Sequence, residues 1–316
     1  MGRILLFGQA RFGASVLEGL LAAGHEIIAV SCPPDRAGRP LDPIKEAAVD
    51  AGIPVVQCRS YRNEEAARAL SAESADLGVL AFVTQIIPVA ILDSPRLASV
   101  CFHPSLLPAY RGGSAINWQL INGETLGGLT LFRPNDGIDS GPIYLQRSLP
   151  IGADDTAASY YYQRVFEPGV EATLEAVEDL LCGRASCVAQ DEARATHDPL
   201  CRAEHAAIDW NRGAEALHNL VRGCDPSPGA HCVWKGTRIR LYGSRRSAGG
   251  GAEAPGTVLG LDDDGMEVAV ADGSLRFAKI SYGELGKGVA LELAAEIGIS
   301  IGGRLENGVI ADATRE

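Results

Sequence analysis

The chain has 316 residues, 46% of them hydrophobic, which is enough apolar material for two cores that need no disulfide or metal to stabilise them. Its net charge of −12 repels phosphate backbones and disfavours a large RNA or DNA partner. No window approaches about 18 consecutive apolar residues and the amino terminus lacks a cleavable leader pattern, so we expect a cytoplasmic protein without a membrane partner.

The amino-terminal half alternates short apolar runs with amphipathic segments. We expect strands at 3–8, 25–32, 53–58 and 77–82, and helices at 12–24, 43–52 and 64–73. This alternation predicts the α/β class, as a Rossmann-like doubly wound parallel sheet with helices on both faces. The first turn, from Gly8 to Gly13, does not fit G-x-G-x-x-G, so we expect no NAD, and we interpret its glycines as allowing close packing.

The next apolar run, 98–103, ends at His103 and a proline turn. Asp139 follows a later apolar run, 127–133, so both side chains could reach the sheet edge where ligands bind. A carboxylate beside an imidazole fixes its tautomer and suits it to proton transfer. The residues alone leave open a catalytic pair or a capping histidine with a turn aspartate.

The remaining chain predicts a second unit. A helix over 156–183, interrupted near Pro168, follows a cap at Asp154-Asp155-Thr156. Residues 190–205 are polar and aperiodic, which favours a linker between domains at 1–189 and 206–316. Short strands between Gly and Asp turns then predict a small antiparallel, OB-like barrel. The scattered cysteines, without a Cys-x-x-Cys pair, predict reduced thiols and no metal site.

Several motifs carry a resemblance to a known family. HPSLLP at 103–108, YRGGSAINWQLINGE at 110–124 and DGIDSG at 136–141 resemble the formyltransferases that use 10-formyltetrahydrofolate, which include methionyl-tRNA formyltransferase. The likeness runs nearly end to end and is greatest to the amino-terminal hydrolase domain of 10-formyltetrahydrofolate dehydrogenase. It implies a Rossmann-like domain followed by an OB-like barrel.

The resemblance also implies site residues. His103 would be the acid/base and Asp139 its essential partner, which also binds the folate. The backbone of Gln85, Ile86 and Ile87 would hold the pterin ring. The remaining implied residues, which would shape the turn beside the site and bind substrate, are Arg111, Gly112 and Gly113.

Cys101 departs from the family pattern, in which transferases commonly have an asparagine that donates to the formyl oxygen. A thiol is a weak donor, so this contribution would be lost. Cys101 lies two residues before His103 and could instead be a nucleophile that carries the formyl group as a thioester, or a small buried side chain.

Three hypotheses follow. The first is transfer of the formyl group of 10-formyltetrahydrofolate to a small amine acceptor. The second is hydrolysis to formate and tetrahydrofolate, which the greatest resemblance favours. The third is a non-catalytic protein that binds formyl-folate, which the presence of both His103 and Asp139 argues against.

Overall fold

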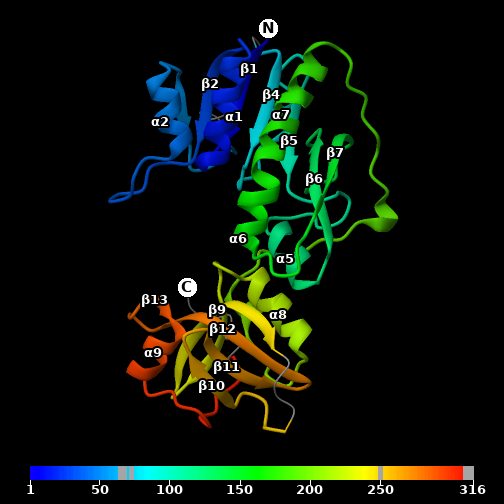
Figure 1. Cartoon of the computed structure of the whole chain (residues 1–316). Helices are drawn as coiled ribbons and strands as arrows, with labels where there is room; N and C mark the ends of the chain where they lie inside the picture. The colour runs from blue at the N-terminus through cyan, green and yellow to red at the C-terminus, as the bar shows by residue number, and fades with distance from the viewer. Residues whose placement is uncertain (63–69, 71–74, 248–251, 309–316) are drawn as a thin grey trace. The chain divides into compact units, whose positions relative to one another are not determined.

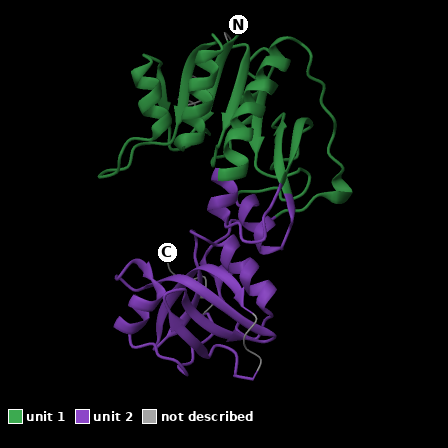
Figure 2. Ribbon diagram, viewed as in Figure 1, with its two compact units in different colours: residues 1–113, 127–149, 163–197 green, residues 114–126, 150–162, 198–316 purple. Residues whose placement is uncertain are grey.

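The computed structural model describes residues 1–62, 70, 75–247 and 252–308. The helix expected at 64–73 therefore falls almost entirely outside the described residues. The chain forms two compact units. The first comprises residues 1–113, 127–149 and 163–197, and the second comprises 114–126, 150–162 and 198–316 (Figure 2). The second unit thus includes two segments that precede residue 189.

The first unit is built on a seven-stranded sheet in the order β3-β2-β1-β4-β5-β6-β7 (Figure 1). Its strands are β1 (Arg3–Gly8), β2 (Glu26–Cys32), β3 (Val55–Gln57), β4 (Leu77–Ala81), β5 (Ser99–His103), β6 (Leu126–Phe132) and β7 (Ile143–Pro150). The five strands from β3 to β5 are parallel, whereas β6 runs antiparallel to β5. The Rossmann-like class is confirmed, but the sheet is mixed and not wholly parallel as expected.

Helices pack on this sheet through apolar faces. They are α1 (Ala10–Ala22), α2 (Pro43–Asp50), the single turn α4 (Val89–Leu92) and α7 (Phe166–Leu181). Gly8 and Gly13 allow α1 to approach the sheet, since a Cβ on Gly8 would lie 3.4 Å from the Cα of Gly13, and one on Gly13 would lie 3.4 Å from the carbonyl carbon of Gly8. The expectation that these glycines serve close packing is confirmed.

The long helix expected at 156–183 is divided. Thr156 caps α6 (Ala157–Tyr160), as expected, and accepts a hydrogen bond from Ser159 N at 3.1 Å. A π-helical segment follows at Tyr161–Val165, before α7. The interruption therefore precedes Pro168, which lies in the first turn of α7, where its missing N–H is tolerated.

Gly169 of α7 provides a stability prediction. A Cβ there would lie 2.8 Å from Phe102 Cε2 and 3.0 Å from Phe12 Cε2, and these two rings stack with centroids 4.4 Å apart. We expect Gly169→Ala to lower the free energy of unfolding by about 1–3 kcal/mol through overpacking, measured by urea denaturation. Gly260→Ala is the control, because its Cβ meets nothing closer than 3.8 Å. Equal stability of both variants would contradict this packing.

The second unit contains an antiparallel sheet in the order β10-β11-β12-β9-β8, with β13 paired to β12. Its strands are β8 (Ala230–Trp234), β9 (Thr237–Ser247), β10 (Val258–Asp262), β11 (Gly265–Val270), β12 (Gly273–Tyr282) and β13 (Lys287–Val289). Residues 304–306 bridge its two edge strands, because Arg304 pairs with Thr257 and Glu306 pairs with Val233. The helices of this unit are α5 (Ala115–Ile121), α6, α8 (Ala214–Gly223) and α9 (Ala290–Glu296).

No helix in the described part of the chain is long and apolar enough to cross a bilayer.

Candidate functional site

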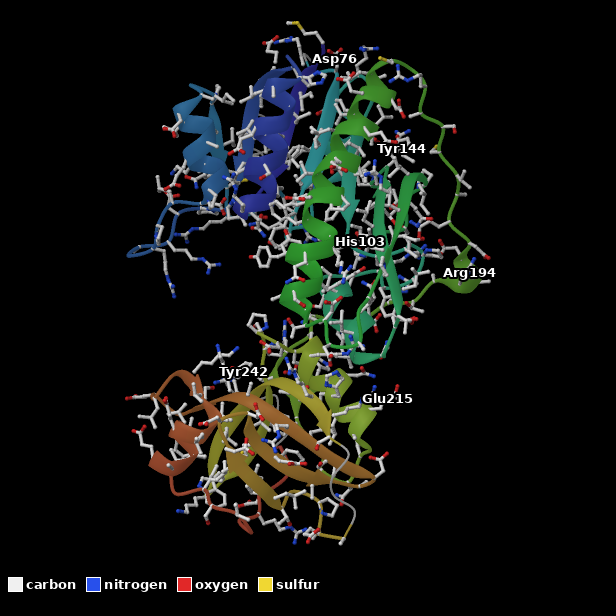
Figure 3. All side chains as sticks on the ribbon, viewed as in Figure 1. Asp76, His103, Tyr144, Arg194, Glu215 and Tyr242 are labelled. Carbon is white, nitrogen blue, oxygen red and sulfur yellow. The ribbon has the colours of Figure 1, made fainter. Side chains whose placement is uncertain are left out.

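His103 is the last residue of β5 and lies opposite Thr130 of β6 (Figure 3). Alternation along β5 directs Phe102 to the opposite face, where it packs on Phe12, and leaves Cys101 and His103 on a common face. The His103 side chain is only 7% exposed, and its Nε2 lies 2.8 Å from the carbonyl oxygen of Tyr110. A carbonyl can only accept, so Nε2 carries a proton and donates it.

Asp139 faces the other ring nitrogen of His103. Its Oδ2 lies 3.5 Å from His103 Nδ1 and accepts a hydrogen bond from Gly112 N at 2.8 Å. Because β6 is antiparallel, it ends beside Cys101 and away from the carboxyl end of β5. The loop after β6 turns back to bring Asp139 to His103, and Asp139 itself adopts a left-handed conformation with φ of 50°.

This arrangement makes Nδ1 of His103 the nitrogen that can exchange a proton. Nδ1 of His103 and Oδ2 of Asp139 are 3.5 Å apart, which exceeds the range of about 2.7–3.2 Å for a full N–H···O hydrogen bond. A substrate atom can therefore compete with Asp139 for a proton on Nδ1. The nearby carboxylate stabilises the imidazolium that forms when Nδ1 takes a proton. The pair is therefore suited to moving a proton toward and away from a reacting atom.

Cys101 lies beside the same carboxylate. Burial raises the pKa of the Cys101 thiol well above its ordinary value, and the charge of Asp139 raises it further. The Cys101 side chain is partly buried and packs against a core cluster that includes Leu80. At neutral pH Cys101 is therefore a protonated thiol, which is a poor nucleophile.

This protonation state predicts slow alkylation of Cys101. At pH 8 we expect iodoacetamide to modify Cys187, which is exposed, at least about tenfold faster than Cys101, because the thiolate is the reacting species. Peptide mass spectrometry over a time course measures both rates in one sample. Rapid, stoichiometric labelling of Cys101 in the folded protein would favour the nucleophile hypothesis instead.

Arg111 is buried, and protein acceptors surround its guanidinium. It donates to both carboxylate oxygens of Glu192 at 2.7 and 2.9 Å, and to Gln190 Oε1 at 2.8 and 3.1 Å. Gly112, at φ of 113°, supplies the N–H that binds Asp139, and Gly113 is exposed. Of the three residues expected at this turn, Gly112 thus contacts the histidine–aspartate pair directly.

Gln85, Ile86 and Ile87 follow β4 and precede α4. Among the described residues, no hydrogen bond is found for the backbone of these three, and the buried Oε1 of Gln85 has no partner. Ile86 is 65% exposed, whereas Ile87 is buried. This segment therefore presents backbone donors and acceptors that are available to a ligand.

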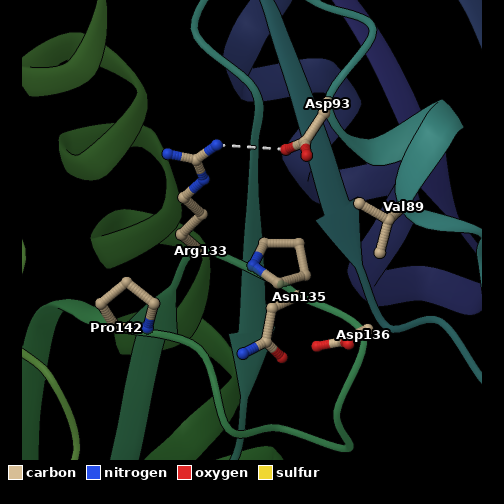
Figure 4. A pocket seen from close by; sticks show the side chains of 7 residues that line it. Val89, Asp93, Arg133, Asn135, Asp136 and Pro142 are labelled. Carbon is tan, nitrogen blue, oxygen red and sulfur yellow. Dashed lines mark hydrogen bonds and ion pairs between the residues drawn. The ribbon is translucent and has the colours of Figure 1, made fainter.

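A cavity of about 540 Å³ opens between α4 and the loop after β6 (Figure 4). Its lining residues are Val89, Asp93, Arg133, Pro134, Asn135, Asp136 and Pro142. Arg133 and Asp93 form an ion pair at 3.2 Å across it. The hollow is open to solvent, and one of its walls is the loop that carries Asp139, but neither His103 nor Asp139 lines it.

Three contributors to this site were not predicted from the sequence. Gln190, Glu192 and the carbonyl of Tyr110 contact Arg111, Asp139 or His103, and the first two lie in the segment interpreted as a linker. That segment is polar and aperiodic, so it carries no local signal of its contacts. Within the described ranges, no cluster of three or more His, Cys, Asp or Glu side chains could hold a metal ion.

Comparison with known proteins identifies the family. Residues 2–177 match the model described as formyl transferase, and residues 201–285 match the formyl transferase C-terminal domain. The chain belongs to the formyl transferase family. The expected family is thereby confirmed.

Two curated relatives show how far the similarity extends. The chain is 38% identical over 283 residues to methionyl-tRNA formyltransferase of Ectopseudomonas mendocina, covering 88% of this chain and 89% of that protein. It is 40% identical over 247 residues to mitochondrial 10-formyltetrahydrofolate dehydrogenase of Mus musculus, covering 77% of this chain. The match spans only 27% of the dehydrogenase.

Solved structures share the fold. HypX from Aquifex aeolicus, in complex with tetrahydrofolic acid, has a TM-score of 0.69 and 22% identity over 95% of this chain and 48% of its own. WlaRD, a sugar 3N-formyl transferase, has a TM-score of 0.68 and 18% identity over 88% of this chain and 97% of its own. The formyltransferase fold is therefore shown for this chain.

Proposed function

We propose that this member of the formyl transferase family moves the formyl group of 10-formyltetrahydrofolate to a small amine, with His103 as the acid/base and Asp139 as its partner. The observation that carries the proposal is the approach of Asp139 Oδ2 to 3.5 Å from His103 Nδ1 at the carboxyl end of β5. Binding alone requires no titratable pair in this position, which argues against a protein that only binds formyl-folate.

The folate would lie against Gln85, Ile86 and Ile87. A pterin ring is flat and carries both donors and acceptors along its edge, which complements the free backbone groups of this segment and the unpartnered Oε1 of Gln85. The exposed Ile86 supplies an apolar surface beside them. Two similar proteins support the same ligand. They are HypX, solved in complex with tetrahydrofolic acid, and mitochondrial 10-formyltetrahydrofolate dehydrogenase.

In the proposed reaction, the acceptor nitrogen forms a bond to the formyl carbon while the bond between that carbon and the folate nitrogen breaks. The folate nitrogen receives the bonding electron pair and needs a proton, and the acceptor nitrogen must lose one. Nδ1 of His103 can take this proton and return it, because Nε2 remains bound to Tyr110 throughout. Asp139 stabilises the charged ring between the two steps.

The net charge of −12 supports a small acceptor over a tRNA, because a negatively charged surface would repel the phosphate backbone at long range.

Hydrolysis to formate is the second candidate, and Cys101 does not oppose it. This position holds a protonated thiol in place of the asparagine of typical transferases, so it offers the formyl oxygen only a weak donor. The mitochondrial 10-formyltetrahydrofolate dehydrogenase of Mus musculus, to which this chain is 40% identical over 247 residues, also supports this candidate. Water would then take the place of the amine in the same proton path.

The test is incubation of the purified protein with 10-formyltetrahydrofolate, following tetrahydrofolate by absorbance and formate by a coupled assay. If the protein is a transferase, we expect little formate without an amine acceptor and rapid release of tetrahydrofolate once a suitable amino sugar or amino acid is added. Rapid formate release without an amine would establish hydrolysis. Folate binding without turnover under either condition, with all acceptors tested, would contradict an enzymatic role of the His103–Asp139 pair.

A further inference from the structure

We propose that residues 190–197, here called the brace, position the His103–Asp139 pair, and that Gln190 is a positioning residue for the reaction. This inference rests on the proposed function. The brace follows α7 and runs beside the turn after β5, all within the first unit. It contacts the backbone on both sides of the pair.

Gln190 holds the aspartate side. Its Nε2 donates to the carbonyl oxygen of Asp139 at 2.8 Å and to that of Gly141 at 2.7 Å. Asp139 is in the left-handed region, which costs conformational energy even for aspartate and is maintained by its surroundings. Two hydrogen bonds from a single amide to this loop provide that constraint and direct the Asp139 carboxylate toward His103.

Arg111 in turn holds Gln190. The guanidinium binds Gln190 Oε1 through Nε and Nη2, and Glu192 through Nη1 and Nη2. Because Oε1 is occupied in this way, the amide nitrogen of Gln190 can only point toward Asp139 and Gly141. Arg111 and Glu192 therefore fix the orientation of the Gln190 amide.

Thr196 holds the histidine side. Its Oγ1 accepts from Tyr110 N at 2.7 Å and its carbonyl accepts from Arg111 N at 3.0 Å. The carbonyl of Tyr110 receives the Nε2 proton of His103, so the brace also fixes the ring orientation. Catalytic groups lose about 10²-fold in rate when misplaced by roughly 1 Å, which makes such support consequential.

Gln190→Glu separates the positioning role from a structural one. The carboxylate of the variant still accepts from Arg111, so the brace stays attached, but it cannot donate to the carbonyls of Asp139 and Gly141 and repels them. We expect kcat for formyl loss to fall about 10- to 100-fold, with the Kd for tetrahydrofolate within about threefold and the thermal midpoint within a few degrees of the unmodified protein.

Gln57→Glu is the matched control. The amide of Gln57 also donates to a backbone carbonyl, that of Pro33, and its Oε1 accepts from Lys45 Nζ at 3.0 Å, but it lies on β3, at the opposite edge of the sheet from β6 and β7. We expect this variant to lower the unfolding midpoint by as much as Gln190→Glu does, while kcat stays within about twofold. Parallel losses of kcat and stability in both variants would show that the brace is merely structural and would overturn the inference.

A readout independent of turnover distinguishes the two proposals. Imidazole NMR signals of His103 should shift in Gln190→Glu and remain in place in Gln57→Glu. Unchanged His103 signals in Gln190→Glu would overturn the positioning role even if the enzyme is active. If the unmodified protein releases no formyl group while the His103 signals shift as expected, the proposed function fails and the positioning geometry stands.

Discussion

Replacement of His103 by glutamine is expected to lower the rate of formyl loss from 10-formyltetrahydrofolate about 10³-fold, the range typical of an acid/base group. The glutamine amide can still donate to the carbonyl of Tyr110, which accepts from His103 Nε2 at 2.8 Å, so the turn after β5 keeps its contact. What the variant lacks is a nitrogen that takes and returns a proton. Stopped-flow or steady-state absorbance of tetrahydrofolate measures the effect.

His25→Gln is the matched control for this experiment. His25 is also buried and also faces a carboxylate, with its Nε2 2.9 Å from Glu178 Oε1, but it precedes β2 at the amino-terminal edge of the sheet. We expect its turnover to remain within about twofold. If His103→Gln keeps wild-type turnover, the acid/base assignment is wrong; if both variants lose turnover equally, the effect reflects damage to the fold.

Asp139→Asn is expected to lower turnover about 10²- to 10³-fold, with the tetrahydrofolate Kd changed by less than about tenfold. The asparagine oxygen can still accept from Gly112 N, which binds Asp139 Oδ2 at 2.8 Å, so the loop can keep its position. The neutral amide no longer stabilises a protonated imidazole ring 3.5 Å away. The measurement is kcat by absorbance together with Kd by fluorescence or calorimetry.

Asp76→Asn controls for loss of a carboxylate elsewhere in the first unit. Asp76 immediately precedes β4, at the far end of the strand from the site, where it accepts from Arg3 N at 2.9 Å (Figure 3). Turnover should stay near the unmodified level. An Asp139→Asn variant with full turnover would remove Asp139 from the mechanism, and one that fails to bind folate would reassign it to binding alone.

The double variant tests whether the two residues act as a unit. If Asp139 works only through His103, His103→Gln combined with Asp139→Asn should be no slower than His103→Gln by more than about threefold. Fully multiplicative losses would indicate that Asp139 acts on the substrate independently.

Much of the first unit could be predicted from local pattern. The apolar run 98–103 predicts β5, and the polar cap at Thr156 predicts the start of α6, because both signals arise from residues adjacent in the sequence. The same pattern directs Cys101 and His103 to one face. The motifs around His103 and Asp139 predicted the family, which the comparisons confirm.

The hydrophobic pattern could not predict the direction in which β6 runs. A strand has the same alternation whichever way it runs, so the run 127–133 could not show that β6 is antiparallel. The expected proximity of Asp139 to His103 arises instead from the loop that turns back after β6. That path depends on the left-handed conformation of Asp139, which is uncommon for a non-glycine residue and has no signal in the hydrophobic pattern.

The sequence by itself determined the succession of strands and helices along the first unit, the strand that ends at His103 and the family to which the chain belongs. The tertiary structure alone decided which groups hold that histidine and Asp139 in place. Arg111 and Gln190 are separated by 79 residues, and the contact between them leaves no periodic or local signal. A hydrogen bond between residues this far apart in the sequence forms only when the sheet is in place and the chain after α7 returns beside it. A polar segment without periodicity carries no signal of its partner.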